Sequence, residues 1–179
     1  KAAHSDGTAV TDATNFSDWG EATVASTVQL EPGLWSLDNF GQVLVATIAN
    51  GKTFTWDAGG TLPLTTRAAT TTSGFATGNN PTATRASLIS PTTRHLIHLG
   101  TETTIGDPTT QDDMFIRFSD QEDINTYAPS VTNAAGTQRL QDGSRIIGSL
   151  KAKETILIWT DNALYTMKFV GAPFTFGFE

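Results

Sequence analysis

The chain has 179 residues, which suits one domain or one large piece of a longer protein. Charged residues make up only 16% and the formal net charge is -7, which disfavours general nucleic-acid binding because phosphate contacts need Lys and Arg. The absence of Cys excludes disulfides and thiolate metal sites.

No apolar run approaches the roughly 20 residues that a membrane helix needs, so we expect no membrane insertion. Frequent Thr and the 16 Gly favour strands and turns over helices. The first residue is not Met, no signal-peptide core follows it, and the last residues stop in mid-pattern. We therefore expect a fragment or a processed product.

Residues 1–33 are polar and small, with Phe16 and Trp19 as large anchors in the first part of this stretch. Such a segment is predicted to form an extended N-terminal arm or strand that lies on a neighbour. Residues 34–179 are predicted to form one β-repeat domain, as a piece of a larger propeller if the chain is a fragment.

Residues 34–57 form the clearest unit, with three antiparallel strands joined by short turns. Asn50-Gly51 is typical of a type I′ hairpin turn, in which both central residues have positive φ. In the strand that follows, Phe54 and Trp56 alternate with Thr, which places both rings on one face.

The rest of the domain continues as short strands separated by polar loops. Long or irregular loops are predicted at 58–83, 101–113 and 124–142, where adjoining copies would order them. Strands are predicted at 84–90, 94–99, 114–118, 145–150, 154–159 and 163–170, the last of the chain.

A loose internal repeat places an aromatic residue and an Asp at the end of three strands: Phe54-Thr-Trp56-Asp57, Phe118-Ser-Asp120 and Trp159-Thr-Asp161. Strands that repeat in this way stack on one another to bury their faces. The pattern predicts an all-β fold of repeated small antiparallel sheets, β-propeller-like, with a β-sandwich as the alternative. No stretch has the periodicity of an amphipathic helix.

His95 and His98 are the first candidates for a metal site. In a helix they would share a face, but the surrounding run has the pattern of a strand, where their odd spacing sends them to opposite faces. A zinc site without Cys would also need carboxylates to complete it. We therefore expect no metal at these residues.

Asp120, Glu122 and Asp123 form an acidic turn, preceded by Asp112 and Asp113. Such a group could bind a hard cation or supply a pair of acid and base carboxylates. We favour the alternative, in which the turn is solvated and its Asp side chains cap local backbone N–H groups. The spacing fits no EF-hand loop.

Aromatic and arginine residues offer a third candidate, a sugar site. Residues 47–54, TIANGKTF, resemble the end of a sialidase-type aspartate box, but Ala49 stands where that box has its Asp. Trp35, Trp56 and Trp159 are most simply core rings that close strands, although a ring could stack on a sugar. The sequence does not single out the arginines of a sialidase among Arg67, Arg85, Arg94, Arg117, Arg139 and Arg145.

No nucleophile elbow, P-loop or dinucleotide fingerprint is present. We assign no catalytic, cofactor-binding or metal-binding residue, and expect neither an enzyme, nor a cofactor, nor a small-molecule substrate.

Three segments resemble a family of tailed-bacteriophage virion proteins: Leu34–Asp57, Ser119–Ala135 and Trp159–Phe178. The resemblance implies a structural component of the virion, in the tail or neck, such as a nozzle or tube-like part that assembles through subunit interfaces. Its implied partners are copies of itself and other virion proteins, with passing contact with genome DNA. An acidic lumen lined by residues such as Asp112 would repel that DNA.

Two hypotheses from other classes stay open. One is a β-propeller module that binds or cleaves host glycans, and the other is a free-standing interaction domain of a cellular β-propeller.

Overall fold

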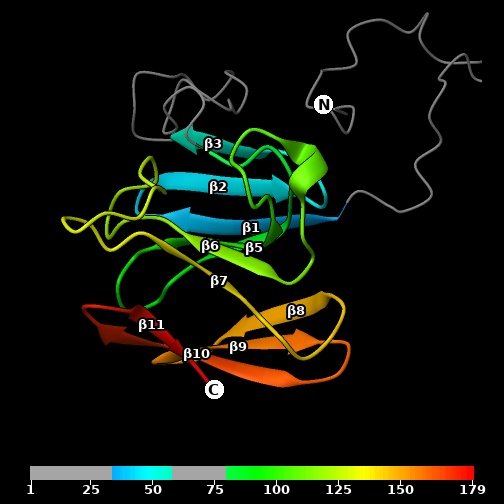
Figure 1. The fold of residues 1–179 in the computed structure, drawn as a ribbon. Helices are drawn as coiled ribbons and strands as arrows, with labels where there is room; N and C mark the ends of the chain where they lie inside the picture. The colour runs from blue at the N-terminus through cyan, green and yellow to red at the C-terminus, as the bar shows by residue number, and fades with distance from the viewer. Residues whose placement is uncertain (1–33, 58–79) are drawn as a thin grey trace, which may run out of the picture.

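The structure, a computed structural model, describes residues 34–57 and 80–179 (Figure 1). These residues form eleven β-strands and one short 3₁₀ turn, Pro108–Thr110, in which the Asp107 side chain accepts a hydrogen bond from the backbone N–H of Thr109. The predicted all-β class is confirmed. The predicted arm, residues 1–33, and most of the predicted loop at 58–83 lie outside the described residues.

The strands form three antiparallel sheets, and in each sheet the strands that are consecutive in the chain are neighbours. Sheet 1 contains β1 (Trp35–Phe40), β2 (Val43–Ile48) and β3 (Thr53–Asp57). Sheet 2 contains β4 (Thr84–Ile89), β5 (Leu96–Thr101), β6 (Phe115–Phe118) and β7 (Gly136–Arg139). Sheet 3 contains β8 (Ile146–Lys151), β9 (Thr155–Thr160), β10 (Leu164–Gly171) and β11 (Thr175–Phe178).

The sheets lie one above another, with sheet 2 between sheets 1 and 3 (Figure 1). They are not closed into a ring. Sheet 2 is therefore covered on both faces, whereas sheets 1 and 3 each pack on it with one face.

The seam between sheets 2 and 3 is apolar. Aliphatic and aromatic side chains from both sheets are almost fully buried there, chiefly Leu88, Ile97, Leu99, Met114, Ile116, Phe118, Leu140, Ile146, Ile156, Ile158, Met167 and Phe176. These residues alternate with others along their strands, which is why one face of each sheet carries them all. Hydrophobic burial is the main stabilising contribution of this seam.

The seam between sheets 1 and 2 combines a small apolar cluster, which includes Val45, Ile89 and Leu96, with a row of buried hydroxyl groups. The Thr47 hydroxyl oxygen lies 2.9 Å from that of Thr53 and 2.6 Å from that of Ser87, which belongs to β4. Because buried hydroxyls are costly unless hydrogen-bonded, this network specifies how the two sheets align.

The first strands of the sheets, β1, β4 and β8, line one groove. Each of them contributes a Ser-Leu pair to it: Ser36-Leu37, Ser87-Leu88 and Ser149-Leu150. The three sheets are thus arranged around a shared inner edge, which we call the inner groove.

One carboxylate joins all three strands at the inner groove. Asp38 of β1 accepts a hydrogen bond from the backbone N–H of Ile89 in β4, at 2.8 Å. The same carboxylate accepts from the Lys151 ammonium of β8 at 2.6 Å and 2.7 Å. Beside it, the Ser36 hydroxyl accepts from the backbone N–H of Ser87. Side chains of β1 therefore satisfy two edge N–H groups of β4 that have no strand partner.

The aromatic–Asp repeat does not coincide with this arrangement. Its three copies end β3, β6 and β9, which are the third, third and second strands of their sheets. The repeat therefore does not mark equivalent positions in the three sheets.

Most predicted strands are confirmed within about two residues, but two strands were missed. β7 lies in the stretch predicted to be irregular, because Gly136–Arg139 is polar and mostly exposed at a sheet edge. β11 lies after the segment predicted to be the last strand, and a turn at residues 172–174 separates it from β10; Thr175, with φ 57°, is its first residue. β7 lacks the apolar alternation that a half-buried strand shows, whereas Phe176 and Phe178 of β11 alternate with Thr175 and Gly177, a signal that we did not use.

The predicted type I′ turn at Asn50-Gly51 is also corrected. Asn50 has φ 57°, but Gly51 is not among the glycines with positive φ. Gly51 instead donates to the carbonyl of Ile48 at 3.0 Å and accepts from the N–H of Thr84 at 3.1 Å. The hairpin therefore forms, and the carbonyl of Gly51 joins sheet 1 to sheet 2.

We predict that Asp38→Ala lowers the free energy of unfolding by about 1–3 kcal/mol, because it leaves a partly buried N–H and an ammonium without their acceptor. Asp38→Asn keeps an acceptor for the Ile89 N–H and should recover part of the loss. Chemical denaturation measures both. Glu154→Ala, in the exposed turn between β8 and β9, is the control and should change stability little. Equal effects of all three variants would contradict the role of Asp38.

Candidate functional site

The structure separates His95 from His98, as their strand spacing predicts. His95 lies toward sheet 3, with its ring centroid 5.0 Å from that of Phe176 and 6.4 Å from that of Phe118. His98 lies on the opposite face, where its Nε2 shares a 3.0 Å hydrogen bond with the Tyr127 hydroxyl. The two rings therefore belong to different seams.

Burial makes neutral His98 the favoured form. Removal from water, with the Arg117 charge as a smaller cause, lowers the pKa of His98 to about 3. Burial also lowers the pKa of His95, although the Asp120 charge opposes this shift. Burial, and next the charge of Asp123, raise the pKa of Tyr127 well above its usual range.

The acidic turn uses its carboxylates to cap the backbone. Asp120 accepts from the N–H groups of Gln121 and Ala134, at 2.8 Å and 2.7 Å. Asp123 accepts from the N–H of Asn125 at 2.8 Å and from the Thr126 hydroxyl at 2.7 Å. These are the local caps that we favoured from the sequence. Within residues 34–57 and 80–179, no three His, Asp or Glu side chains are grouped so as to hold a metal ion.

The other carboxylates of the predicted acidic group are held in ion pairs. Asp112 accepts from Arg139 at 2.6 Å, Asp113 accepts from Arg85 at 2.7 Å, and Glu122 lies 3.9 Å from Arg94. Reversing these charges would break the pairs.

The arginines considered for a sialidase-type site contact different partners. Arg94 lies over the Phe40 ring, 4.9 Å from its centroid. Buried Arg117 donates hydrogen bonds to the carbonyls of Glu102 and Thr103. Arg67 lies outside the described residues, and Arg145 is exposed near the start of β8. The described arginines thus contact different loops rather than one shared centre.

Glu102 is a buried carboxylate that sequence reasoning missed. It accepts from the backbone N–H groups of Thr82, Ala83 and Gly106 at 2.8, 2.6 and 2.7 Å, and from the Thr82 hydroxyl. These bonds join the segment before β4 to the loop after β5. The charge is compensated by hydrogen bonds and by nearby Arg117, so its role in the structure is to order two loops.

Trp35 and Trp159 are not core rings, contrary to our expectation. The side chain of Trp35 lies on the face of sheet 1 that points away from sheet 2, and the residue is 48% exposed. Trp159 lies on the face of sheet 3 that points away from sheet 2 and is 37% exposed. Both rings became exposed because each terminal sheet packs on sheet 2 with one face only.

These two outward faces are candidate interaction surfaces, and we call them the sheet 1 end face and the sheet 3 end face. The strand register places Trp35, Leu37, Leu44, Phe54 and Trp56 on the sheet 1 end face. It places Leu150, Leu157, Trp159 and Leu164 on the sheet 3 end face. Leu37, Leu150 and Leu164 are 64%, 57% and 51% exposed. Large apolar residues that share an exposed face mark an interaction site.

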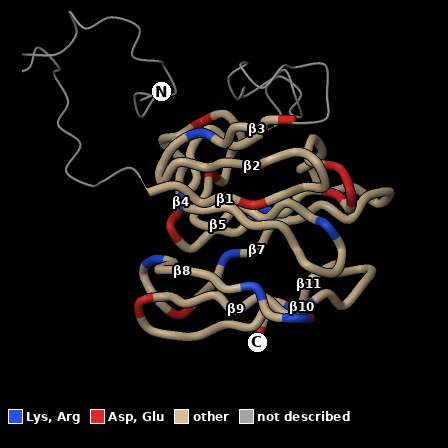
Figure 2. Tube along the Cα trace, turned by 180° about the vertical axis from the view of Figure 1, so that it is seen from behind, with Lys and Arg blue, Asp and Glu red and all other residues tan. Residues whose placement is uncertain are grey.

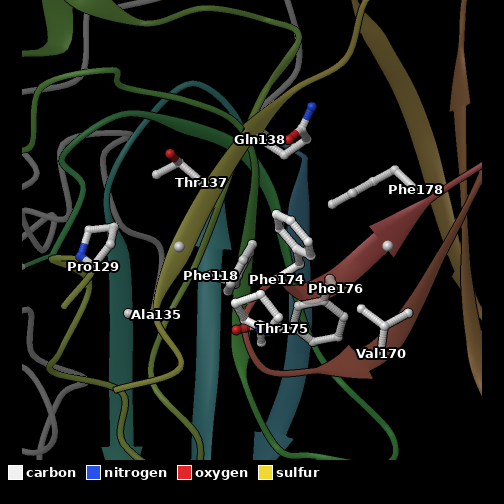
Figure 3. A pocket seen from close by; sticks show the side chains of 13 residues that line it. Phe118, Pro129, Ala135, Thr137, Gln138, Val170, Phe174, Thr175, Phe176 and Phe178 are labelled. Atoms are coloured by element: carbon white, nitrogen blue, oxygen red, sulfur yellow. The ribbon is translucent and has the colours of Figure 1, made fainter. Parts of the chain in front are cut away.

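A second candidate is the outer groove, a cavity of about 490 Å³ between β7 and β11, the last strands of sheets 2 and 3. Figure 3 shows the rings of Phe118, Phe174 and Phe176 gathered between the two strands. The Thr175 hydroxyl crosses the groove to donate to the carbonyl of Ala134 at 3.0 Å. The inner groove has a similar volume, about 490 Å³.

Gly136 permits the close approach of β7 to the floor of the outer groove. A Cβ at this position would lie only 2.5 Å from Cζ of Phe118. The backbone of β7 and the Phe118 ring are therefore in contact because no side chain separates them.

Comparisons with known proteins add no relative: no family model, curated protein or solved structure matches this chain. Within the described residues, no helix has the length and apolar character needed to cross a membrane.

We predict that Gly136→Ala lowers the free energy of unfolding by about 1–3 kcal/mol, because the added methyl overlaps Phe118. Gly148→Ala in β8 is the matched control, since a Cβ there meets no atom within 4 Å. Thermal or chemical denaturation measures both variants. Equal stability of the two would show that the contact between β7 and Phe118 is looser than described.

The free energy of unfolding should depend on pH through His98. Its pKa is about 3 in the folded chain and about 6.5 when unfolded, so the stability that neutral His98 allows is present above pH 6.5 and lost as pH falls toward 3. One such group contributes a slope of up to about 1.4 kcal/mol per pH unit.

Denaturation between pH 4.5 and 6.5 should show this slope, with a further part from His95. His98→Gln cannot take up the proton and should reduce the slope by about one proton. His95→Gln is the parallel variant that reports the contribution of the other ring. A slope unchanged in His98→Gln would contradict a buried neutral His98.

Proposed function

We propose that this chain is a structural component of a tailed-bacteriophage virion, placed in the tail or neck and assembled through contacts between β-sheet faces. The observation that carries the proposal is the pair of apolar end faces. Within residues 34–57 and 80–179, sheet 2 is covered on both faces by other strands, whereas sheets 1 and 3 each have one face that no described strand covers.

Covering the end faces would stabilise an assembly. Burying the exposed part of a half-exposed Leu or Trp contributes roughly 1 kcal/mol at about 25 cal/mol per Å². Five such residues are Trp35, Leu37, Leu150, Trp159 and Leu164. Together they offer a few kcal/mol, which suits contacts repeated many times in a particle better than a single isolated pair.

The proposal includes a propeller-type arrangement of the sheets. The first strands share the inner groove and the last strands β7 and β11 flank the outer groove, so the strands of sheets 2 and 3 run from the inside to the outside. A sandwich consists of two sheets packed face to face, which does not account for a middle sheet covered on both sides.

The phage assignment is supported by the sequence resemblance, whose segments fall on sheet 1, on one loop and on part of sheet 3. One covers sheet 1, one forms the loop that leads into β7, and one runs from the end of β9 through β11. The capped acidic turn belongs to the second of these segments. The resemblance therefore concerns elements that shape the fold and contribute to both grooves.

Quantitative mass spectrometry of purified particles tests this assignment. Particles of a phage that encodes the chain should contain it in several copies, at a ratio to the capsid protein that stays constant across a density gradient. Detection in infected cells but not in particles would contradict the proposal. If the isolated chain also bound sugars on a glycan array, the host-glycan module would replace it.

A further inference from the structure

We infer that the outer groove binds an extended, uncharged segment of another polypeptide, which adds to sheet 2 as a further strand beside β7. Such a segment is recognised through its backbone and through the apolar side chains that alternate along it. The inference concerns a sheet edge, and it depends neither on the end faces nor on the virion assignment.

The backbone of β7 has hydrogen-bonding groups that no described strand uses. The N–H of Leu140 donates to the carbonyl of Met114 at 3.0 Å, which fixes the phase of the ladder between β6 and β7. Gly136 and Gln138 therefore direct their N–H and C=O groups toward β6, and Thr137 directs its own to the opposite side. Among the described residues, the backbone of Thr137 has no hydrogen-bond partner.

The other wall of the groove, β11, is also the edge of a sheet. The backbones of Thr166 and Glu179 exchange hydrogen bonds of 2.8 Å and 3.1 Å, so the N–H and C=O of Phe178 point away from β10. The register of β10 with β11 is interrupted by a shift between Phe169 and Gly171. The register of β6 with β7 runs without a shift, so β7 is the more regular template for a new strand.

The chain protects the edge of β4 but not that of β7. Two N–H groups of β4 donate to the side chains of Ser36 and Asp38. β7 contains neither Pro nor Lys, it has no bulge, and its one charged side chain, Arg139, is paired with Asp112. Prolines, lysines, bulges and covering segments are the devices that keep strand edges from pairing. The described residues therefore leave the edge of β7 open to another backbone.

The groove also has an apolar lining for alternate side chains of the added strand. The Phe118 ring lies against the backbone of Gly136, and Phe174 and Val170 line the groove while 76% and 57% exposed (Figure 3). Its volume of about 490 Å³ is within the range of roughly 300–1,000 Å³ that ligand sites have. Side chains on one face of a new strand would cover these rings.

The absence of charge in the groove restricts the kind of partner. Charged residues are scattered over the chain in Figure 2, but none of the residues that line the groove is charged. A charged side chain buried beside the rings would have no partner there, which is costly. A nucleic acid would find no Lys or Arg among the lining residues. The observations therefore favour an extended peptide that presents apolar residues and hydroxyl groups.

A synthetic peptide tests the site with the full chain. The probe is Thr-Val-Thr-Phe-Thr-Val-Thr, with a fluorophore at its N-terminus and two lysines after its last residue for solubility. Fluorescence anisotropy should show saturable binding. Two further versions carry N-methyl groups on the odd or on the even amides. One should bind about tenfold more weakly or worse, because its methyl groups replace the N–H groups that face β7, and the other within about twofold.

Variants of the chain test the same contacts from the other side. Thr137→Pro removes the free N–H without taking a bond from the sheet, a position at which edge strands accept proline. Phe174→Ala removes the exposed ring. Each should weaken binding by about tenfold. Leu164→Ala is the matched control, an exposed apolar residue of sheet 3 outside the groove, and should bind as the unmodified chain does. Circular dichroism checks that each variant is folded.

Amide hydrogen exchange measured by NMR reports on the edge itself. In the free chain, the N–H of Gln138 should be protected by β6, whereas the N–H of Thr137 should exchange far faster. Saturating peptide should slow exchange at Thr137 by about tenfold or more. Exchange at Gln138 should change much less, because its hydrogen bond is already formed.

Four results would overturn the inference. They are no saturable binding at about 1 mM peptide, equal losses with both methylated versions, protection that appears at Phe178 instead of Thr137, and a Thr137 N–H already protected in the free chain. In the last case, protection that rises with protein concentration identifies a second copy as the occupant, and constant protection identifies another part of the same chain. The proposed virion function is tested separately, by the presence of the chain in particles.

Discussion

The side chain of Asp38 is the contact on which the arrangement of the three sheets depends. It satisfies an edge N–H of β4 and neutralises an ammonium of β8 while it belongs to β1, so one partly buried carboxylate fixes three strands that are far apart in the chain. Its neighbour Ser36 fixes the other edge N–H of β4. Because edge strands are otherwise open to unwanted pairing, these side chains also protect the inner edge.

The functional interpretation follows from what this arrangement leaves uncovered. A stack of three sheets has two outward faces, and here both carry exposed tryptophan and leucine residues. The titratable groups, in contrast, are used within the fold: His95 and His98 lie in different seams, and Glu102, Asp120 and Asp123 order loops.

The all-β class and most strands were predictable, because runs such as Val43–Ile48 and Thr155–Thr160 combine β-branched residues with turn signals on both sides. The polar edge strand β7 was not, since nothing in GTQR distinguishes it from a loop until β6 supplies its partner. The outward faces were also not predictable. Alternation shows that a strand has two faces, but which face another sheet covers depends on tertiary contacts.

The two seams of the molecule differ in the force that holds them, and temperature acts on those forces differently. Hydrophobic attraction weakens on cooling, whereas hydrogen bonds between hydroxyl groups do not share this dependence. The seam of sheets 2 and 3, built from residues such as Ile156 and Phe118, is therefore the one that cold would loosen first. The Thr47–Ser87 side of the stack would keep its alignment under the same chilling.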